Sequence, residues 1–229
     1  MRTEQTVHLT RTEKSYRTKK MTIMAIMTAI AYLVTFFFHF PMFGFLSLEF
    51  KDTIIAFASF IFGPLAGFVM IVVCALIELV TISSTGWIGL IMNILSSSAF
   101  VCVAALIHKK KPCPKNAVIG VIVGTVTMTA VMILWNYLIT PLYMGVSREA
   151  VTQMLIPTFM PFNMLKGGLN ASLAIMLYPT ISILEKANLI PKKEDTETPH
   201  KRLNIGVLIF AAVVLITCVF FVLTLTGII

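Results

Sequence analysis

Charged side chains are scarce in this sequence. Asp, Glu, Lys and Arg make up 12% of the 229 residues, whereas hydrophobic residues make up 58%, and the mean hydropathy is +0.92. Soluble globular domains carry about 25% charged residues. The composition therefore excludes an ordinary soluble domain and predicts an all-α integral membrane protein.

Several catalytic and metal-binding patterns are also missing. The sequence contains no GxxxxGK[ST] phosphate loop, no HExxH and no GxSxG, which argues against P-loop ATP hydrolysis and against common hydrolase chemistry. The four cysteines form no CxxC pair and the four histidines lie in separate regions, so neither a disulfide nor a metal site is expected. Active transport by this chain would need a partner that supplies energy.

Long apolar runs take the place of these motifs, and they predict seven membrane spans. The approximate bounds of the spans are 21–38, 51–62, 65–82, 87–107, 117–138, 159–184 and 203–226. The second run is short, and residues 46–50 could extend it. Residues 140–149 are expected to leave the membrane and to precede a short interfacial helix at 150–157.

Basic residues are concentrated outside the apolar runs. Fifteen of the 18 Lys and Arg residues lie in the segments 1–20, 108–115 and 185–202. Basic loops mark the cytoplasmic side, and all three segments fall on that side if the N-terminus is inside. Seven spans then place the C-terminus outside, and a nucleic-acid partner is not expected.

The same pattern divides the chain into four parts. We predict a basic cytoplasmic tail at 1–20, a six-helix substrate-binding membrane domain at 21–186, a polar cytoplasmic linker at 187–202 and an additional transmembrane helix at 203–229.

Lys166 lies inside the sixth apolar run. A lysine in mid-membrane costs about 3 kcal/mol on insertion scales, so it marks a functional site or reaches back to the headgroups. Asn163 and Asn170 stand three residues before it and four residues after it, which places all three on one helix face. This polar face, if it points into a bundle, can bind a small polar molecule.

Other polar residues inside the runs are weaker candidates. Asn136 ends the fifth run, and its amide could equally cap the helix end. Glu78 lies inside the third run, where a carboxylate marks a functional site or pairs with Lys166. Asn93, in the fourth run, could contact a ligand or bond to a neighbouring helix.

Two further groups have structural explanations. Glu49, Lys51 and Asp52 open the second run, where we expect solvated residues of a first helical turn. Ala25 and Ala29 place small residues four apart in the first run, which favours close packing against another helix of this chain or against a different protein.

Four segments, in their order and spacing, carry a resemblance to a known family. They are Ser47–Asp52, Phe62–Gly67, Gly124–Thr129 running on into Asn136-Tyr137 and Pro141–Tyr143, and Pro161–Lys166. Together they resemble the substrate-binding S components of energy-coupling-factor (ECF) vitamin transporters, and among these the riboflavin-specific type. The resemblance covers about residues 20–186.

The resemblance implies a six-helix S-component bundle, here with an extra C-terminal transmembrane helix, and a vitamin pocket near the outer face. A flavin has a flat ring with a polar edge that amides can pair with, and apolar side chains can cover its faces. The expected substrate-binding residues are Asn136, Asn163, Lys166, Asn170, Glu78, Asn93, Phe43, Phe45 and Leu46.

The resemblance also implies partners. An ECF transmembrane coupling protein and two cytoplasmic ATPase subunits are expected, with Ala25 and Ala29 docking on the coupling protein. Riboflavin enters as the transported ligand, and no cofactor or metal is expected. The stretch Val73–Glu78 lacks the lysine that riboflavin-type members often carry after an acid. Another vitamin or a modified base is therefore an alternative ligand. Two alternatives from other classes rank below it: an intramembrane enzyme that uses Glu78 and Lys166, and a structural membrane scaffold.

Overall fold

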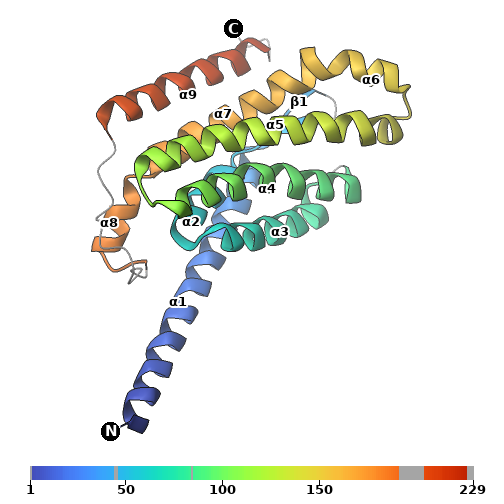
Figure 1. Cartoon of the computed structure of the whole chain (residues 1–229). Helices are drawn as coiled ribbons and strands as arrows, with labels where there is room; N and C mark the ends of the chain where they lie inside the picture. The colour runs from blue at the N-terminus through green and yellow to red at the C-terminus, as the bar shows by residue number, and fades with distance from the viewer. Residues whose placement is uncertain (1, 44–45, 84, 191–203, 226–229) are drawn as a thin grey trace.

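The chain folds into a bundle of helices with one small β-hairpin. The computed structural model describes residues 2–43, 46–83, 85–190 and 204–225. Its elements are α1 (Arg2–Phe37), β1 (Phe40–Phe43), β2 (Leu46–Leu48), α2 (Lys51–Phe62), α3 (Pro64–Thr81), α4 (Gly86–Lys110), α5 (Pro114–Met144), α6 (Arg148–Met154), the π-helical turn η1 (Leu155–Phe159), α7 (Met160–Leu177), α8 (Thr180–Lys186) and α9 (Ile205–Leu225). Figure 1 shows the N-terminal part of α1 projecting from the bundle and α9 lying along α7.

Six helical segments in the described part of the chain are long and apolar enough to cross a membrane. They are Ser15–Phe37, Pro64–Thr81, Gly86–Lys110, Pro114–Met144, Arg148–Lys186 and Ile205–Thr224. The remaining predicted span corresponds to α2, which has 12 residues. At 1.5 Å per residue this helix is about 18 Å long, short of the roughly 30 Å of a hydrocarbon core.

The expectation that residues 46–50 extend α2 is wrong. Leu46–Leu48 forms β2, which pairs antiparallel with β1 in the register Phe40 to Leu48 and Pro41 to Ser47. The segment alternates buried and half-buried side chains, as a strand with one covered face does. Leu46 packs among Val151, Phe159 and Phe162, and Leu48 packs against Leu165 and Leu169. The hairpin is therefore fixed onto α6, η1 and α7.

Two predicted helix ends also differ from the structure. Residues 140–144 continue α5 instead of leaving it at Leu138, because Pro141 sits in the last turn, where its missing N–H removes a single helical bond. The predicted single helix over 159–184 breaks at Tyr178-Pro179, where α7 ends and α8 begins. The predicted short helix at 150–157 covers most of α6, which is capped by the Ser147 hydroxyl, and the start of η1.

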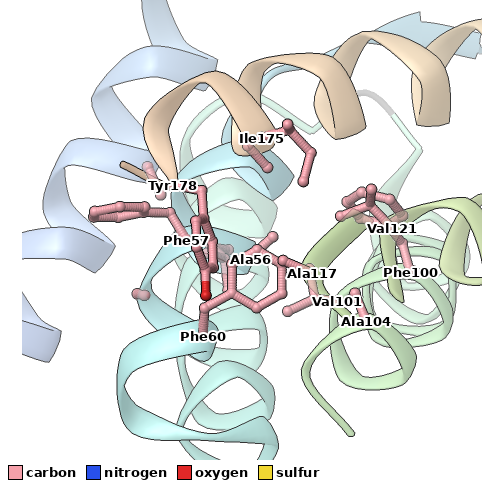
Figure 2. Close-up of a cluster of buried hydrophobic side chains, with 14 of the residues drawn as sticks. Ala56, Phe57, Phe60, Phe100, Val101, Ala104, Ala117, Val121, Ile175 and Tyr178 are labelled. Atoms are coloured by element: carbon pink, nitrogen blue, oxygen red, sulfur yellow. The ribbon is translucent and has the colours of Figure 1, made fainter. Parts of the chain in front are cut away.

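α4 and α5 touch backbone to backbone. A Cβ atom on Gly120 would lie 2.6 Å from the carbonyl oxygen of Ala104, and one on Gly124 would lie 2.6 Å from that of Phe100. Only glycine permits such an approach. Around this contact lies the main core, which Figure 2 shows as side chains of α2, α4, α5 and α7 gathered between the helices.

α9 packs on α7 close to the hairpin. Its residues Leu215, Cys218 and Val222 contact the cluster formed by Leu48, Leu165 and Leu169, and the rest of its surface is largely exposed. Most of the predicted linker at 187–202 lies outside the described residues, as do the last four residues of the predicted additional helix at 203–229.

Candidate functional site

Buried charges gather where α2 begins. Glu49, in the loop between β2 and α2, lies 3.0 Å from the Lys51 ammonium and 3.3 Å from the Lys166 ammonium through its Oε2 atom. Its Oε1 atom faces His39 Nδ1 at 3.6 Å. Burial alone would raise the pKa of Glu49, but the two ammonium groups outweigh burial and hold that pKa below its usual range. Glu49 is therefore the anionic centre of the group.

The network continues into α3 and α4. Lys51 Nζ also lies 2.5 Å from Glu78 Oε2, and this oxygen accepts a hydrogen bond from the Asn93 amide at 3.3 Å. Glu49, Lys51, Glu78 and Lys166 are only 4%, 2%, 3% and 6% exposed. Charges buried to this extent are tolerated because each has an opposite charge within contact distance. The ion network, meaning these four residues, thus joins the loop before α2 to α2, α3 and α7.

Asn170 holds α7 against the start of α2. Its Nδ2 atom donates to the carbonyl oxygens of Glu49 and Lys166, both at 2.9 Å. Its Oδ1 atom accepts from the backbone N–H of Thr53 at 2.9 Å and from the Thr53 hydroxyl at 2.8 Å. Both donors and both acceptor positions of the amide are used, so Asn170 positions Glu49 and Lys166 and has no free group to offer a ligand.

Two adjoining cavities lie beside the ion network. The first, of about 80 Å³, is lined by residues that include Glu49, Glu78 and Asn93. The second, of about 20 Å³, is lined by residues that include Asn163 and Lys166. Four residues belong to both linings: Leu46, Ser47, Met92 and Asn93. Because two of these are in β2, the hairpin covers both cavities. We call the two cavities and their lining the hairpin site.

The hairpin site combines few polar groups with apolar walls. Amides and charges come from Asn93, Asn163 and Lys166, while Met92 and Phe162 supply apolar surface. Small-molecule sites have this composition, with a few placed polar groups in a mainly apolar concavity. The described residues contain no group of three or more His, Cys, Asp or Glu residues able to hold a metal ion. The lining groups themselves offer hydrogen bonds, charge and apolar contact to a small molecule.

Comparison with known proteins identifies the family. Residues 19–178 match the sequence model of the family described as ECF transporter, substrate-specific component. The chain belongs to this family. ECF substrate-specific (S) components are transport subunits and not enzymes, so the protein is a multi-pass membrane protein that partners an ECF transporter module.

Individual relatives agree with this assignment. The chain is 30% identical over 168 residues to the riboflavin transporter RibU of Staphylococcus aureus, covering 70% of this chain and 88% of that protein. It is 28% identical over 163 residues to the riboflavin transporter FmnP of Bacillus subtilis, covering 66% and 85%. A solved structure, titled as the structure and mechanism of the S component of a bacterial ECF transporter, aligns with a TM-score of 0.64 at 29% identity. That alignment covers 74% of this chain and 99% of the other.

In this S component, five of the predicted binding residues line the hairpin site. They are Glu78, Asn93, Asn163, Lys166 and Leu46. Lys166 points into the bundle and contacts Glu49, and does not reach back to the headgroups. The alternative pairing of Glu78 with Lys166 is wrong, because Glu78 pairs with Lys51.

Other predicted residues lie elsewhere. Asn136 is fully buried, donates to the Met132 carbonyl at 2.7 Å and accepts from the Thr140 hydroxyl at 2.8 Å, and it is absent from the linings of both cavities. The side chain of Phe43 and the whole of Phe45 lie outside the part of the chain that the structure describes. Ala25 and Ala29 are exposed on α1, so neither is buried against another helix of this chain.

Sequence reasoning missed Glu49 and Lys51. The expectation that Glu49, Lys51 and Asp52 are solvated is wrong, because all three are buried. The distribution of basic residues along the sequence could have singled out Lys51. Outside the three basic segments the chain has only Lys51, Arg148 and Lys166 as cations, and the two lysines among them are the cations of the ion network.

Proposed function

We propose that this S component captures riboflavin from outside the cell and delivers it with an ATPase-driven ECF module. The observation that supports the ligand is that the similar proteins described above carry the name riboflavin transporter, at 28–30% identity over most of their length. The side chains of the hairpin site are compatible with this ligand. Asn93 and Asn163 offer amides to the polar edge of a flavin, and Met92 and Phe162 offer apolar surface to its ring.

The volume of the hairpin site bears on how the ligand enters. The cavities hold about 80 and 20 Å³, whereas sites for molecules of this size are about 300–1,000 Å³. Leu46 and Ser47 line both cavities, so movement of the β1–β2 hairpin away from α7 would join and enlarge them. We infer that riboflavin binds with the hairpin displaced from the position seen here.

The partners and the orientation belong to the same proposal. We infer a transmembrane coupling protein and two cytoplasmic ATPases as partners, with exposed Ala25 and Ala29 forming the docking face for the coupling protein. The N-terminus and the basic segments lie in the cytoplasm. The hairpin site then opens toward the exterior. α2, although short, leads from the hairpin site to the α2–α3 turn at the basic end of the bundle, so with α2 counted as a crossing, α9 crosses outward and the C-terminus lies outside.

Ligand binding can be tested on the purified chain by quenching of riboflavin fluorescence. Wild-type protein should quench the flavin with a saturable curve. Asn163→Ala removes an amide from the hairpin site, where its Nδ2 atom otherwise donates to the Phe159 carbonyl at 2.7 Å. The loss of one hydrogen-bonding group from a binding site should weaken riboflavin binding about tenfold.

Asn116→Ala is the matched control, because Asn116 lies at the other end of the bundle, where it bonds to the Lys111 carbonyl. This variant should bind like the wild type. Absence of quenching by folded wild-type protein would refute the riboflavin assignment. Equal affinities of the two variants would show that Asn163 takes no part in binding, and competition by another vitamin would redirect the ligand assignment.

A further inference from the structure

A larger cavity lies at the other end of the bundle. It holds about 380 Å³ and is enclosed by α1, the α2–α3 turn, the end of α4 and α8. Figure 1 shows α8 and the start of α5 at one end of the bundle, with the end of α5 and α6 at the opposite end. The basic segments border this cavity, so the charge rule that orients the chain places it at the cytoplasmic face. We call it the basal cavity.

The floor of the basal cavity is rigid and aromatic. His108 Nε2 and the Tyr178 hydroxyl lie 3.0 Å apart, and the Phe60 ring packs at 4.9 Å from the His108 ring and 5.9 Å from the Tyr178 ring, centre to centre. Figure 2 shows Phe60 and Tyr178 meeting in this part of the core. Phe60 and His108 line the cavity, so its floor is built from side chains of α2 and α4, with Tyr178 packed against them. None of these three residues lines the hairpin site.

The lining of the basal cavity combines charged and apolar side chains. Lys20 from α1 and Lys109 from α4 contribute two cations, and Glu185 from α8 contributes one anion. Leu65, at the start of membrane-spanning α3, also lines the cavity and is 77% exposed. An exposed leucine and two lysines in the same lining match a molecule that has both an anionic group and a hydrocarbon chain.

We propose that the basal cavity binds an anionic phospholipid. Its phosphate would lie between Lys20 and Lys109, and an acyl chain would follow Leu65 into the bilayer. Basic pockets between transmembrane helices on the cytoplasmic side bind such headgroups. Glu185 repels a bare anion but accepts hydrogen bonds from a headgroup that carries hydroxyls, and this favours phosphatidylglycerol. Tyr16, a further lining residue, offers a phenol hydroxyl to the same headgroup.

The basal cavity is distinct from the inferred coupling-protein face. Tyr16 and Lys20 stand four residues apart and share one face of α1. Ala25 lies five residues beyond Lys20, a rotation of about 140° around the helix at 3.6 residues per turn. Lipid bound in the basal cavity would therefore contact α1 on the side turned away from Ala25 and Ala29.

The test uses the full chain in detergent, with thermal unfolding followed during titration with dioleoyl phosphatidylglycerol. The variant Lys20→Gln/Lys109→Gln should bind this lipid about 30-fold more weakly, at roughly fivefold for each lysine near a membrane surface. The matched control is Lys110→Gln/Lys111→Gln, which removes two exposed cations next to Lys109 that do not line the cavity. It should lose less than about threefold, because these two cations lie outside the cavity lining and act on a bound headgroup only through screening solvent.

Three outcomes would overturn the proposal. Equal losses of lipid affinity in the two double variants would mean that binding depends on the total charge of the protein and not on the cavity. Equal stabilisation by dioleoyl phosphatidylcholine would remove the preference for an anion. Equal stabilisation by soluble glycerol phosphate would make the ligand a free phosphate compound and not a lipid. None of these readouts depends on riboflavin, so the proposed function stands or fails separately.

Discussion

Removal of Lys51 should destabilise the protein severely, and a second substitution should restore much of the loss. Lys51 contacts Glu49 at 3.0 Å and Glu78 at 2.5 Å and is 2% exposed. Lys51→Met leaves Glu78 buried without its cation, while Glu49 keeps Lys166. Breaking a buried pair by removing one partner costs about 3–5 kcal/mol, which for a chain of this size lowers the unfolding temperature by about 6–20 °C.

The double variant Lys51→Met/Glu78→Gln returns the cluster to its original net charge. It should recover most of the lost stability, because a neutral amide keeps hydrogen-bonding capacity without needing a counter-ion. The assay is thermal unfolding in detergent, with Lys115→Met as the exposed-lysine control. A double variant as unstable as Lys51→Met would refute the reasoning, since packing at position 51 and not charge would then dominate.

Three further predictions concern other contacts. Gly124→Ala should cost about 1–3 kcal/mol of stability by overpacking, because the new Cβ meets a backbone oxygen at 2.6 Å; Gly168→Ala, whose Cβ would meet Cys218 Sγ at 3.4 Å, is the control for the same unfolding measurement. Asn170→Ala should weaken riboflavin binding and lower the unfolding temperature together, because Glu49 and Lys166 lose their anchor; loss of binding alone would contradict this. Ala25→Trp should abolish ATP-driven uptake by the assembled transporter while riboflavin binding by the isolated chain persists; normal uptake would refute the docking face.

Much of the fold follows from the sequence because hydropathy and helix length are coupled in a membrane. Long apolar runs located α3, α4 and α9 to within a few residues, whereas α5 continues six residues beyond its predicted end. The errors came at helix ends, where the presence of a proline does not by itself decide whether the helix stops. Pro141 predicts a helix stop, yet α5 runs through it to Met144, whereas Pro179 does separate α7 from α8.

The hairpin site was less accessible to sequence reasoning. Lys166 was predictable because a single lysine within an apolar helix is energetically costly and therefore marks a candidate functional residue. Its partner Glu49 lies 117 positions away in the sequence, and a single sequence contains no signal for pairing over that distance. Asn136 and Asn163 have the same amide, and each donates to the carbonyl four residues before it. Only the packing of α5 and α7 decides that Asn163 also lines a cavity while Asn136 does not.

The glycine contact between α4 and α5 has a consequence for measuring transport. Two helices in van der Waals contact along their main chains cannot slide or separate without losing that fit. The pair should therefore move as one rigid body. Spin labels attached one to each helix would then keep a constant separation through every step of vitamin delivery. Distances from a third label on the hairpin or on α1 to this fixed pair would then report displacements of the hairpin or of α1.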